Sequence, residues 1–171
     1  DAGHDVPPGT PGEIWIKGPA TLSRYWNNEG ATREAIADGW FRTGDIGEVD
    51  GEGELVVLDR KKNMIISGGE NIYPAELERV LEACPEIAEA AVVARPDARW
   101  QEVPVAVVVP RQGASLDREK VLRLFDGELA RFKHPRDVVF AESLPRNVMG
   151  KVQHFALRDL VSHAAKAAQE P

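Results

Sequence analysis

The chain changes its character near Arg60, and this change limits the folds that it can adopt. Ten of its fifteen glycines lie in residues 1–53, between short apolar runs. Short apolar runs separated by glycine-rich turns are typical of strands and hairpins. Residues 50–53 read DGEG, so we expect a hairpin between residues 46–49 and residues 55–58.

Longer amphipathic segments and compact apolar runs follow this boundary. The expected helices of the whole chain cover residues 28–37, 74–84, 117–130 and 153–168. The expected strands after the boundary cover residues 64–66, 89–94, 103–109 and 138–141. These patterns predict an α+β fold, in which a small C-terminal domain of helices packs on a short mixed sheet and follows a β-rich hairpin segment. We place the two segments at residues 1–60 and 61–171.

Helical spacing also predicts which side chains face the core of the second part. Pro74 begins its first helix, because proline is favoured in the first helical turn. Apolar residues that recur every three to four positions share one helix face. The residues expected to face inward are Leu77, Val80, Leu81, Cys84, Val121, Leu122, Phe125, Leu129, Leu157, Leu160, Val161 and Ala164.

The net charge of −7 is unevenly distributed. Residues 1–60 carry five basic and twelve acidic side chains, whereas residues 61–171 carry sixteen of each. Within the second part, residues 120–158 hold eight basic side chains against four acidic ones. A nucleic-acid backbone requires a broad basic surface, so no nucleic-acid partner is expected. The basic stretch fits a small polyanion such as a nucleotide, and it equally fits a solvated helix face.

Several protein classes are excluded by what the sequence lacks. No apolar run approaches the roughly 18–20 residues that span a bilayer, and the first residues resemble no signal or transit peptide. We therefore expect a soluble, cytoplasmic protein with no membrane span. One cysteine and four histidines without ligand spacing predict no disulfide and no metal site. A Walker loop is absent, because Gly150-Lys151 is followed by Val152.

Three clusters suggest chemistry, although each also has a purely structural explanation. Residues 39–45 read GWFRTGD, where the carboxylate of Asp45 either accepts hydrogen bonds from a diol such as a ribose or stabilises its own turn. Residues 59–74 read DRKKNMIISGGENIYP, where basic side chains precede a double glycine that lets a ligand approach the backbone or simply makes a turn. Residues 144–151 read LPRNVMGK, where Lys151 is either a reactive or a solvated lysine.

Taken together and in this order, the clusters resemble the adenylate-forming (AMP-binding) enzyme superfamily. Its acyl-CoA synthetases are the most similar branch, because SGGENIYPAELE at residues 67–78 is their usual wording of this loop. The resemblance covers residues 9–160 and includes GTPGEI at residues 9–14 and LSRYWNN at residues 22–28.

The resemblance implies an ATP-dependent carboxylic acid–CoA ligase. In this family a carboxylate attacks the α-phosphate of ATP to give an acyl-adenylate, and coenzyme A then displaces AMP to form the thioester. A small-molecule carboxylic acid, ATP with Mg²⁺, and coenzyme A are the expected partners. Residues 1–60 would be the end of a large adenylation domain and residues 61–171 its C-terminal lid domain, with the rest of the large domain upstream in the same gene product.

The resemblance also implies a role for individual residues. Asp45 would hold the ribose hydroxyls, and Arg60 would contact the ribose or phosphate side of the adenylate. Lys151 would reach the α-phosphate and the attacking carboxylate, where an ammonium offsets growing negative charge. Lys62 lies where the family has its hinge, about which the small domain rotates between the two half-reactions. The residues expected to bind coenzyme A are Gly68, Gly69, Arg131, Lys133 and Arg136.

The identity of the acid stays open at this point. Residues 130–135, ARFKHP, and residues 144–153 also look like malonyl-CoA synthetases, so the acid is expected to be malonate or a fatty acid. Specificity in this family is set by the large domain. An alternative is that the isolated chain is a non-catalytic lid module that binds nucleotide or coenzyme A.

Overall fold

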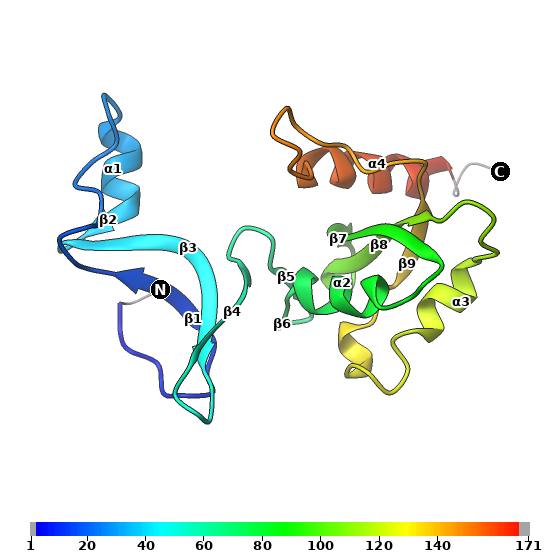
Figure 1. Cartoon of the computed structure of the whole chain (residues 1–171), viewed down its shortest axis with the longest axis horizontal. Helices are drawn as coiled ribbons and strands as arrows, with labels where there is room; N and C mark the ends of the chain where they lie inside the picture. Colours follow the sequence, from blue (N-terminus) through cyan, green and yellow to red (C-terminus); the bar gives the residue numbers. More distant parts are fainter. Residues whose placement is uncertain (1–2, 168–171) are drawn as a thin grey trace. The chain divides into compact units, whose positions relative to one another are not determined.

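The computed structural model describes residues 3–167 and divides into two compact units, Asp1–Lys62 and Asn63–Pro171 (Figure 1). Each unit has its own sheet.

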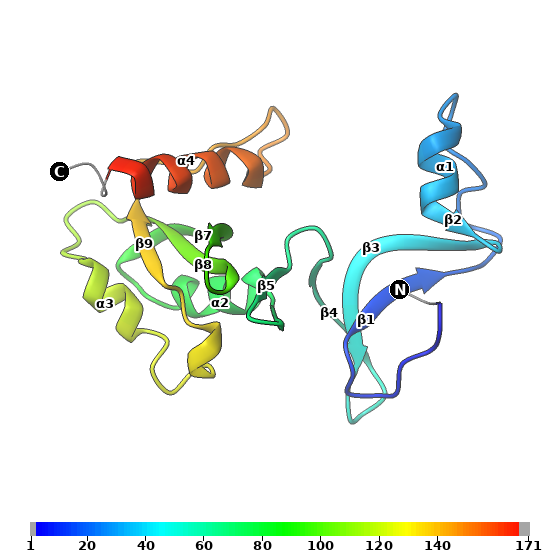
Figure 2. The ribbon, with the colours of Figure 1, turned by 180° about the vertical axis from the view of Figure 1, so that it is seen from behind.

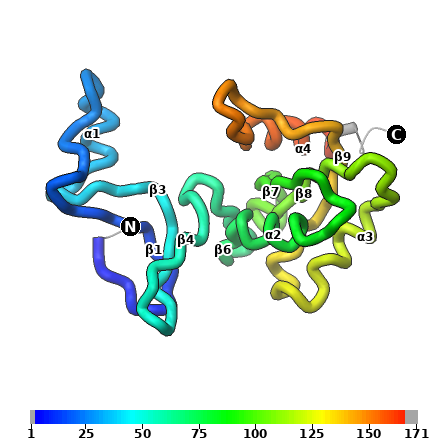
Figure 3. Tube along the Cα trace, viewed as in Figure 1, coloured from blue at the N-terminus to red at the C-terminus, as the bar shows by residue number. Residues whose placement is uncertain are grey.

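The first unit is built around one long strand. Strand β3 (Trp40–Val49) pairs antiparallel with β1 (Gly12–Ile16), β2 (Ile36–Ala37) and β4 (Leu55–Arg60). Figure 3 follows this strand from the neighbourhood of helix α1 (Glu29–Ala35) to the β3–β4 hairpin. The antiparallel pairing therefore places Asp45, in the middle of β3, beside Arg60 at the end of β4.

The hairpin predicted from residues 50–53 is confirmed. Val49 pairs with Leu55, and one carboxylate oxygen of Asp50 accepts the backbone N–H groups of Glu52 and Glu54, both at 2.9 Å. The helix expected over residues 28–37 is shorter. Asn28 caps its start, because the Asn28 side-chain oxygen accepts the backbone N–H of Ala31 at 3.0 Å.

The end of this helix is decided by the neighbouring strand. Ile36 and Ala37 leave the helix because they pair with Phe41 and Trp40 across a turn. Asp38 and Gly39 form that turn with φ of 51° and 78°. An Asp-Gly pair is well suited to positive φ, so strand pairing replaces the last helical turn.

The second unit has a five-stranded mixed sheet. Its strands are β5 (Ile65–Ser67), β6 (Glu70–Ile72), β7 (Ile87–Asp97), β8 (Gln101–Pro110) and β9 (Asp137–Phe140). Their order is β6-β5-β8-β7, and β9 pairs parallel with β8. The helices are α2 (Pro74–Glu82), α3 (Arg118–Arg123), α4 (His154–Ala167) and the 3₁₀ turn η1 (Arg131–Lys133). The predicted α+β class is confirmed.

Helices cover both faces of this sheet, as Figure 2 shows from behind. The unit has two hydrophobic cores, one on each face of the sheet. Because side chains alternate along a strand, β8 supplies residues to both of them. Ala106 and Val108 pack with α2 and α3, whereas Val105, Val107 and Val109 pack with α4. The first core also includes Leu77, Leu81, Val121 and Phe125, and the second includes Leu144, Leu157 and Val161.

The helix expected over residues 117–130 is wrong in its length. Helix α3 ends at Arg123, and the chain continues in turns through residue 129. Gly127, inside the predicted span, has φ of 84°, which lies outside the right-handed helical region. Val121 and Phe125 are nevertheless fully buried, so the apolar spacing predicted the core although the helix stops early. The last expected residue of the C-terminal helix, Ala168, lies outside the described residues.

A carboxylate on β9 joins two arginines in this unit. Asp137 accepts hydrogen bonds from Arg95 at 2.7 Å and from Arg118 at 2.9 Å. Burial raises the pKa of Asp137, but these bonds and one from the Val138 N–H outweigh burial and hold the pKa below its ordinary value. A depressed pKa in the folded state means that the ionised carboxylate stabilises the fold above its unfolded pKa, and that this stability is lost as the pH falls.

We expect Asp137→Asn to lower the free energy of unfolding of the second unit by about 1–2 kcal/mol at pH 7, because the amide keeps the shape and loses the charge. The difference from wild type should shrink below about pH 4, where the wild-type carboxylate also loses its charge. Native-state amide exchange of β8 at pH 7, and urea unfolding at pH 7 and pH 3, measure the change. Glu119→Gln, at an exposed pair with Arg123, is the control. An undiminished difference at pH 3 would contradict the assignment.

Candidate functional site

In the first unit the structure brings Asp45 and Arg60 together. They are register partners on β3 and β4, and the Arg60 Nε lies 2.7 Å from a carboxylate oxygen of Asp45. The Asp45 side chain is 30% exposed and the Arg60 side chain 58%. An ionised carboxylate has about four acceptor positions, so Asp45 can hold Arg60 and still accept hydroxyl groups. The pair offers an acceptor and a cation side by side.

The turn before Asp45 is held by its own side chains. Thr43 Oγ1 accepts the backbone N–H of Asp45 at 3.0 Å and donates to the carbonyl of Ile14 at 2.8 Å. Gly44 has φ of 72°, and its carbonyl accepts the N–H of Lys61 at 2.8 Å. The Thr-Gly-Asp sequence therefore fixes the carboxylate at the junction of β1, β3 and β4.

An ion pair lies next to this turn. The Lys61 ammonium is 3.0 Å from a carboxylate oxygen of Glu13. Burial raises the pKa of Glu13, but hydrogen bonds from Lys61 and Trp15 and the charge of Lys61 outweigh it, so the pKa lies below its ordinary value. Lys62, the expected hinge, follows in an exposed position and is the last residue of the first unit.

In the second unit the double glycine makes a two-residue hairpin turn. Ser67 pairs with Glu70, and Gly68 and Gly69 have φ of 61° and 90°. Such turns require positive φ at both central positions, which explains both glycines structurally. A Cβ on Gly68 would lie 2.7 Å from Trp100, whereas a Cβ on Gly69 would meet open space. Only the Gly69 side of the turn is therefore open to a ligand.

Trp100 connects this turn with the basic residues. Its carbonyl accepts the Gly68 N–H at 2.9 Å, and the guanidinium carbons of Arg99 and Arg136 lie 4.7 and 5.7 Å from its ring centre. The Asp97 carboxylate accepts the N–H groups of Arg99 and Trp100 and so holds this β7–β8 turn. A half-buried indole beside two guanidinium groups offers a flat apolar surface and positive charge to an anionic ligand with a ring.

The other basic residues predicted to bind coenzyme A differ from Arg136. Lys133 lies 2.8 Å from both carboxylate oxygens of Glu76 on α2, with its side chain 23% exposed. This ammonium is therefore already neutralised by a carboxylate of its own unit. Arg131 begins η1 and is exposed.

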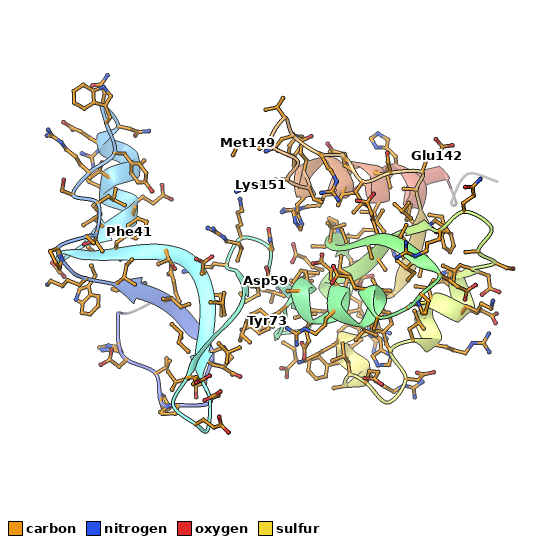
Figure 4. The ribbon with its side chains drawn as sticks, viewed as in Figure 1. Phe41, Asp59, Tyr73, Glu142, Met149 and Lys151 are labelled. Atoms are coloured by element: carbon orange, nitrogen blue, oxygen red, sulfur yellow. The ribbon has the colours of Figure 1, made fainter. Side chains whose placement is uncertain are left out.

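Lys151 lies in a tight loop before α4, where Figure 4 labels it together with Met149. The Asn147 side-chain oxygen accepts the N–H groups of Met149 and Lys151, both at 3.0 Å, and the Asn147 N–H donates to the Lys151 carbonyl at 2.9 Å. Both the N–H and the carbonyl of Lys151 are therefore hydrogen-bonded to Asn147, while the residue is exposed. The loop presents its lysine to solvent on a defined backbone.

Sequence reasoning missed three features of these sites. The first is the position of Trp100 beside the glycine turn, which no periodic pattern in the sequence marks. The second is the Glu76–Lys133 ion pair, which joins residues 57 positions apart. The third is the hydrogen bonding of Arg146 within the Lys151 loop. The His134 side chain is only 16% exposed, and its ring centre lies 5.9 Å from that of Phe125.

Part of the chain matches a known protein family. Residues 76–151, which run from helix α2 to Lys151, match the family described as AMP-binding enzyme C-terminal domain. Over this segment the chain is similar to the C-terminal domain of AMP-binding enzymes. It is 56% identical, over 95% of its length, to indoleacetate–CoA ligase of Aromatoleum aromaticum.

Solved structures of the family are similar as well. Structures of ATP-bound MatB from Rhodopseudomonas palustris and of o-succinylbenzoate CoA synthetase (MenE) from Bacillus subtilis with its acyl-adenylate intermediate have TM-scores of 0.86 and 0.87. They are 42% and 40% identical to the chain and cover 94% and 93% of it. The resemblance to adenylate-forming CoA ligases is therefore confirmed.

The chain spans 32% of the length of each of these three proteins. Among residues 3–167, none of the helices has the length and the apolar character to cross a bilayer. Within the same residues, no group of three or more histidine, cysteine or acidic side chains could hold a metal ion.

Proposed function

We propose that the chain is the C-terminal portion of an ATP-dependent carboxylic acid–CoA ligase. The observation that carries the proposal is the exposed Lys151 on its bound loop, at the end of the segment that matches the AMP-binding enzyme C-terminal domain. Two of the relatives named above are a CoA ligase and a CoA synthetase by name, and the second of them is seen with an acyl-adenylate.

The reaction would proceed in two displacements. A carboxylate oxygen of the acid attacks the α-phosphorus of ATP, and pyrophosphate leaves with the electron pair of the broken P–O bond. The thiolate of coenzyme A then attacks the acyl carbon, and AMP leaves. Both reactants of the first step are anions, so the Lys151 ammonium lowers the barrier by offsetting the charge that accumulates between them. Mg²⁺ would accompany ATP as part of the substrate.

Residues of the first unit would hold the nucleotide. Residues 1–60 are assigned to the end of the large domain, where Asp45 accepts the ribose hydroxyls and Arg60 contacts the ribose or phosphate. The ion pair supports this assignment, because the Arg60 guanidinium is bound to the Asp45 carboxylate and orients it. Lys62 is assigned as the hinge to the lid domain of residues 61–171.

Residues of the second unit would hold coenzyme A. The open side of Gly69 admits the pantetheine arm, while Gly68 is required by the packing of Trp100. Arg136 and Trp100 form a surface for the nucleotide end of coenzyme A, with Arg131 as a further cation. Lys133 would have to exchange Glu76 for a phosphate, which makes it the weakest member of the predicted set.

The acid is proposed to be malonate or a fatty acid, chosen by the upstream large domain. Two of the relatives above are named for other acids, indoleacetate and o-succinylbenzoate, at 56% and 40% identity. Comparable similarity to enzymes for different acids fits a portion of the protein that does not contact the acid's side chain.

ATP–pyrophosphate exchange tests the proposed function. The longer protein that contains this chain should exchange labelled pyrophosphate into ATP when at least one acid from a panel of fatty acids and short dicarboxylates is present. The 171-residue chain alone should show no acid-dependent exchange, because it lacks most of the length of its relatives. Absence of exchange in the longer protein with every acid would contradict the proposal, and robust exchange by the short chain would refute the lid assignment.

A further inference from the structure

The peptide bond between Gly150 and Lys151 is held at both of its polar ends. Its carbonyl, that of Gly150, accepts a hydrogen bond from the Arg146 guanidinium at 2.7 Å. Its N–H, that of Lys151, donates to the side-chain oxygen of Asn147 at 3.0 Å. Because a peptide unit is planar, these two bonds together fix the orientation of the whole plane that enters the Lys151 Cα.

Glycine makes this restraint necessary. Gly150 has φ of 78°, and a Cβ at this position would meet nothing within 4 Å. A glycine in open space can exchange between conformations that other residues avoid, so the plane after it is free to rotate unless it is bound. Rotation of that plane would redirect the Lys151 side chain, since the plane defines where the Cα–Cβ bond points.

Arg146 is itself anchored to the sheet. Its second guanidinium nitrogen forms an ion pair with the carboxylate of Glu89, which lies on β7 opposite Val109 of β8. A fork of donors suits this geometry, because one guanidinium can bind a carboxylate and a carbonyl at the same time. Arg146 also pairs its backbone with Val152, which closes the base of the loop.

Packing alone does not hold this guanidinium. Arg146 and Glu89 line an open groove of about 460 Å³, and their side chains are 46% and 35% exposed. The carboxylate of Glu89 therefore supplies the anchor on the open side. Arg111 lines the same groove, but its guanidinium donates to the Pro85 carbonyl at 2.9 Å.

We propose that Arg146, anchored by Glu89, is a positioning residue that fixes the Gly150–Lys151 peptide plane and thereby the direction of the Lys151 side chain. Its effect on catalysis rests on the proposed function of Lys151. Its effect on the loop does not, because the hydrogen bonds lie within the second unit. The two parts are therefore tested separately.

The first test measures the loop itself in the 171-residue chain. Arg146→Met keeps most of the side-chain length and removes the fork, and Glu89→Gln keeps an acceptor and removes the charge. We expect Arg146→Met to speed hydrogen exchange of the Lys151 amide by about tenfold, the loss of roughly 1.4 kcal/mol of local protection, and Glu89→Gln to speed it less. The matched control Arg111→Met should leave this amide unchanged. Wild-type exchange of the Lys151 amide in folded Arg146→Met would overturn the proposal.

The second test measures catalysis in the longer protein. Arg146→Met should lower the turnover of acyl-adenylate formation by about 10- to 100-fold with little change in the KM for ATP, because a misdirected ammonium acts mainly on the transition state. Thioester formation from supplied acyl-adenylate should be unaffected, and Arg146→Lys should recover only part of the rate. Lys151→Ala is measured in parallel. If Lys151→Ala lowers the rate of adenylation and Arg146→Met does not, the positioning role of Arg146 is overturned. If Lys151→Ala has no effect, the proposed function of the lysine fails, and the exchange of the Lys151 amide alone decides whether Arg146 fixes the peptide plane.

Discussion

We expect Lys151→Ala in the longer protein to slow acyl-adenylate formation by about 10²- to 10³-fold, the typical effect of removing one group that stabilises transition-state charge. The lysine is exposed on a bound loop, so its removal deletes an ammonium without a packed side chain. The effect should be confined to the first half-reaction, because the second displacement expels AMP and does not join two anions at the phosphate. Single-turnover assays with ATP and acid, and separately with acyl-adenylate and coenzyme A, measure the two steps.

Lys120→Ala is the matched control for this substitution. Lys120 is also an exposed lysine of the second unit, and its ammonium donates to the Ser115 carbonyl near α3. We expect this variant to keep wild-type rates in both half-reactions. Equal losses in both variants, or a Lys151→Ala protein that forms acyl-adenylate at the wild-type rate, would contradict the role given to Lys151.

The second large effect concerns stability. Phe125 is fully buried in the core between α2, α3 and the sheet, and its ring lies 5.9 Å from that of His134. We expect Phe125→Ala to lower the free energy of unfolding of the second unit by about 3–5 kcal/mol, because it removes a buried ring and leaves a cavity. Native-state amide exchange of β8, which is central in the same sheet, reports this change for the second unit separately from the first.

Phe155 provides the comparison on the surface. It lies on α4 with 65% of its area exposed, so Phe155→Ala should change the free energy of unfolding by less than about 0.5 kcal/mol. A small effect of Phe125→Ala, equal to that of Phe155→Ala, would show that the core between α2, α3 and the sheet is not formed as described.

Local chemistry explains why some elements were predictable. The DGEG turn, Pro74 at a helix start and the apolar run of residues 103–109 act through neighbouring residues, and all three appear in the structure as expected, the last as part of β8. The end of α3 was not predictable from its apolar spacing, because the same spacing served a series of turns that still bury Phe125.

The sites show the same division. The bond between Asp45 and Arg60 follows from register across a hairpin that the sequence predicted, although the sequence did not give the contact. The partners of Gly68 and Lys133 come from distant positions, namely Trp100 and Glu76, and no local pattern marks them. Long-range pairing decides which basic side chains are available to a ligand, and it becomes visible only in the folded unit.

The fate of labelled carboxylate oxygen tests the central claim most directly. An acid labelled with ¹⁸O in its carboxylate is incubated with the longer protein, ATP and coenzyme A, and the products are separated and weighed by mass spectrometry. Attack of the carboxylate on the α-phosphorus predicts one ¹⁸O atom in AMP and none in pyrophosphate. Label in orthophosphate or pyrophosphate, or thioester formed with unlabelled AMP, would contradict the account.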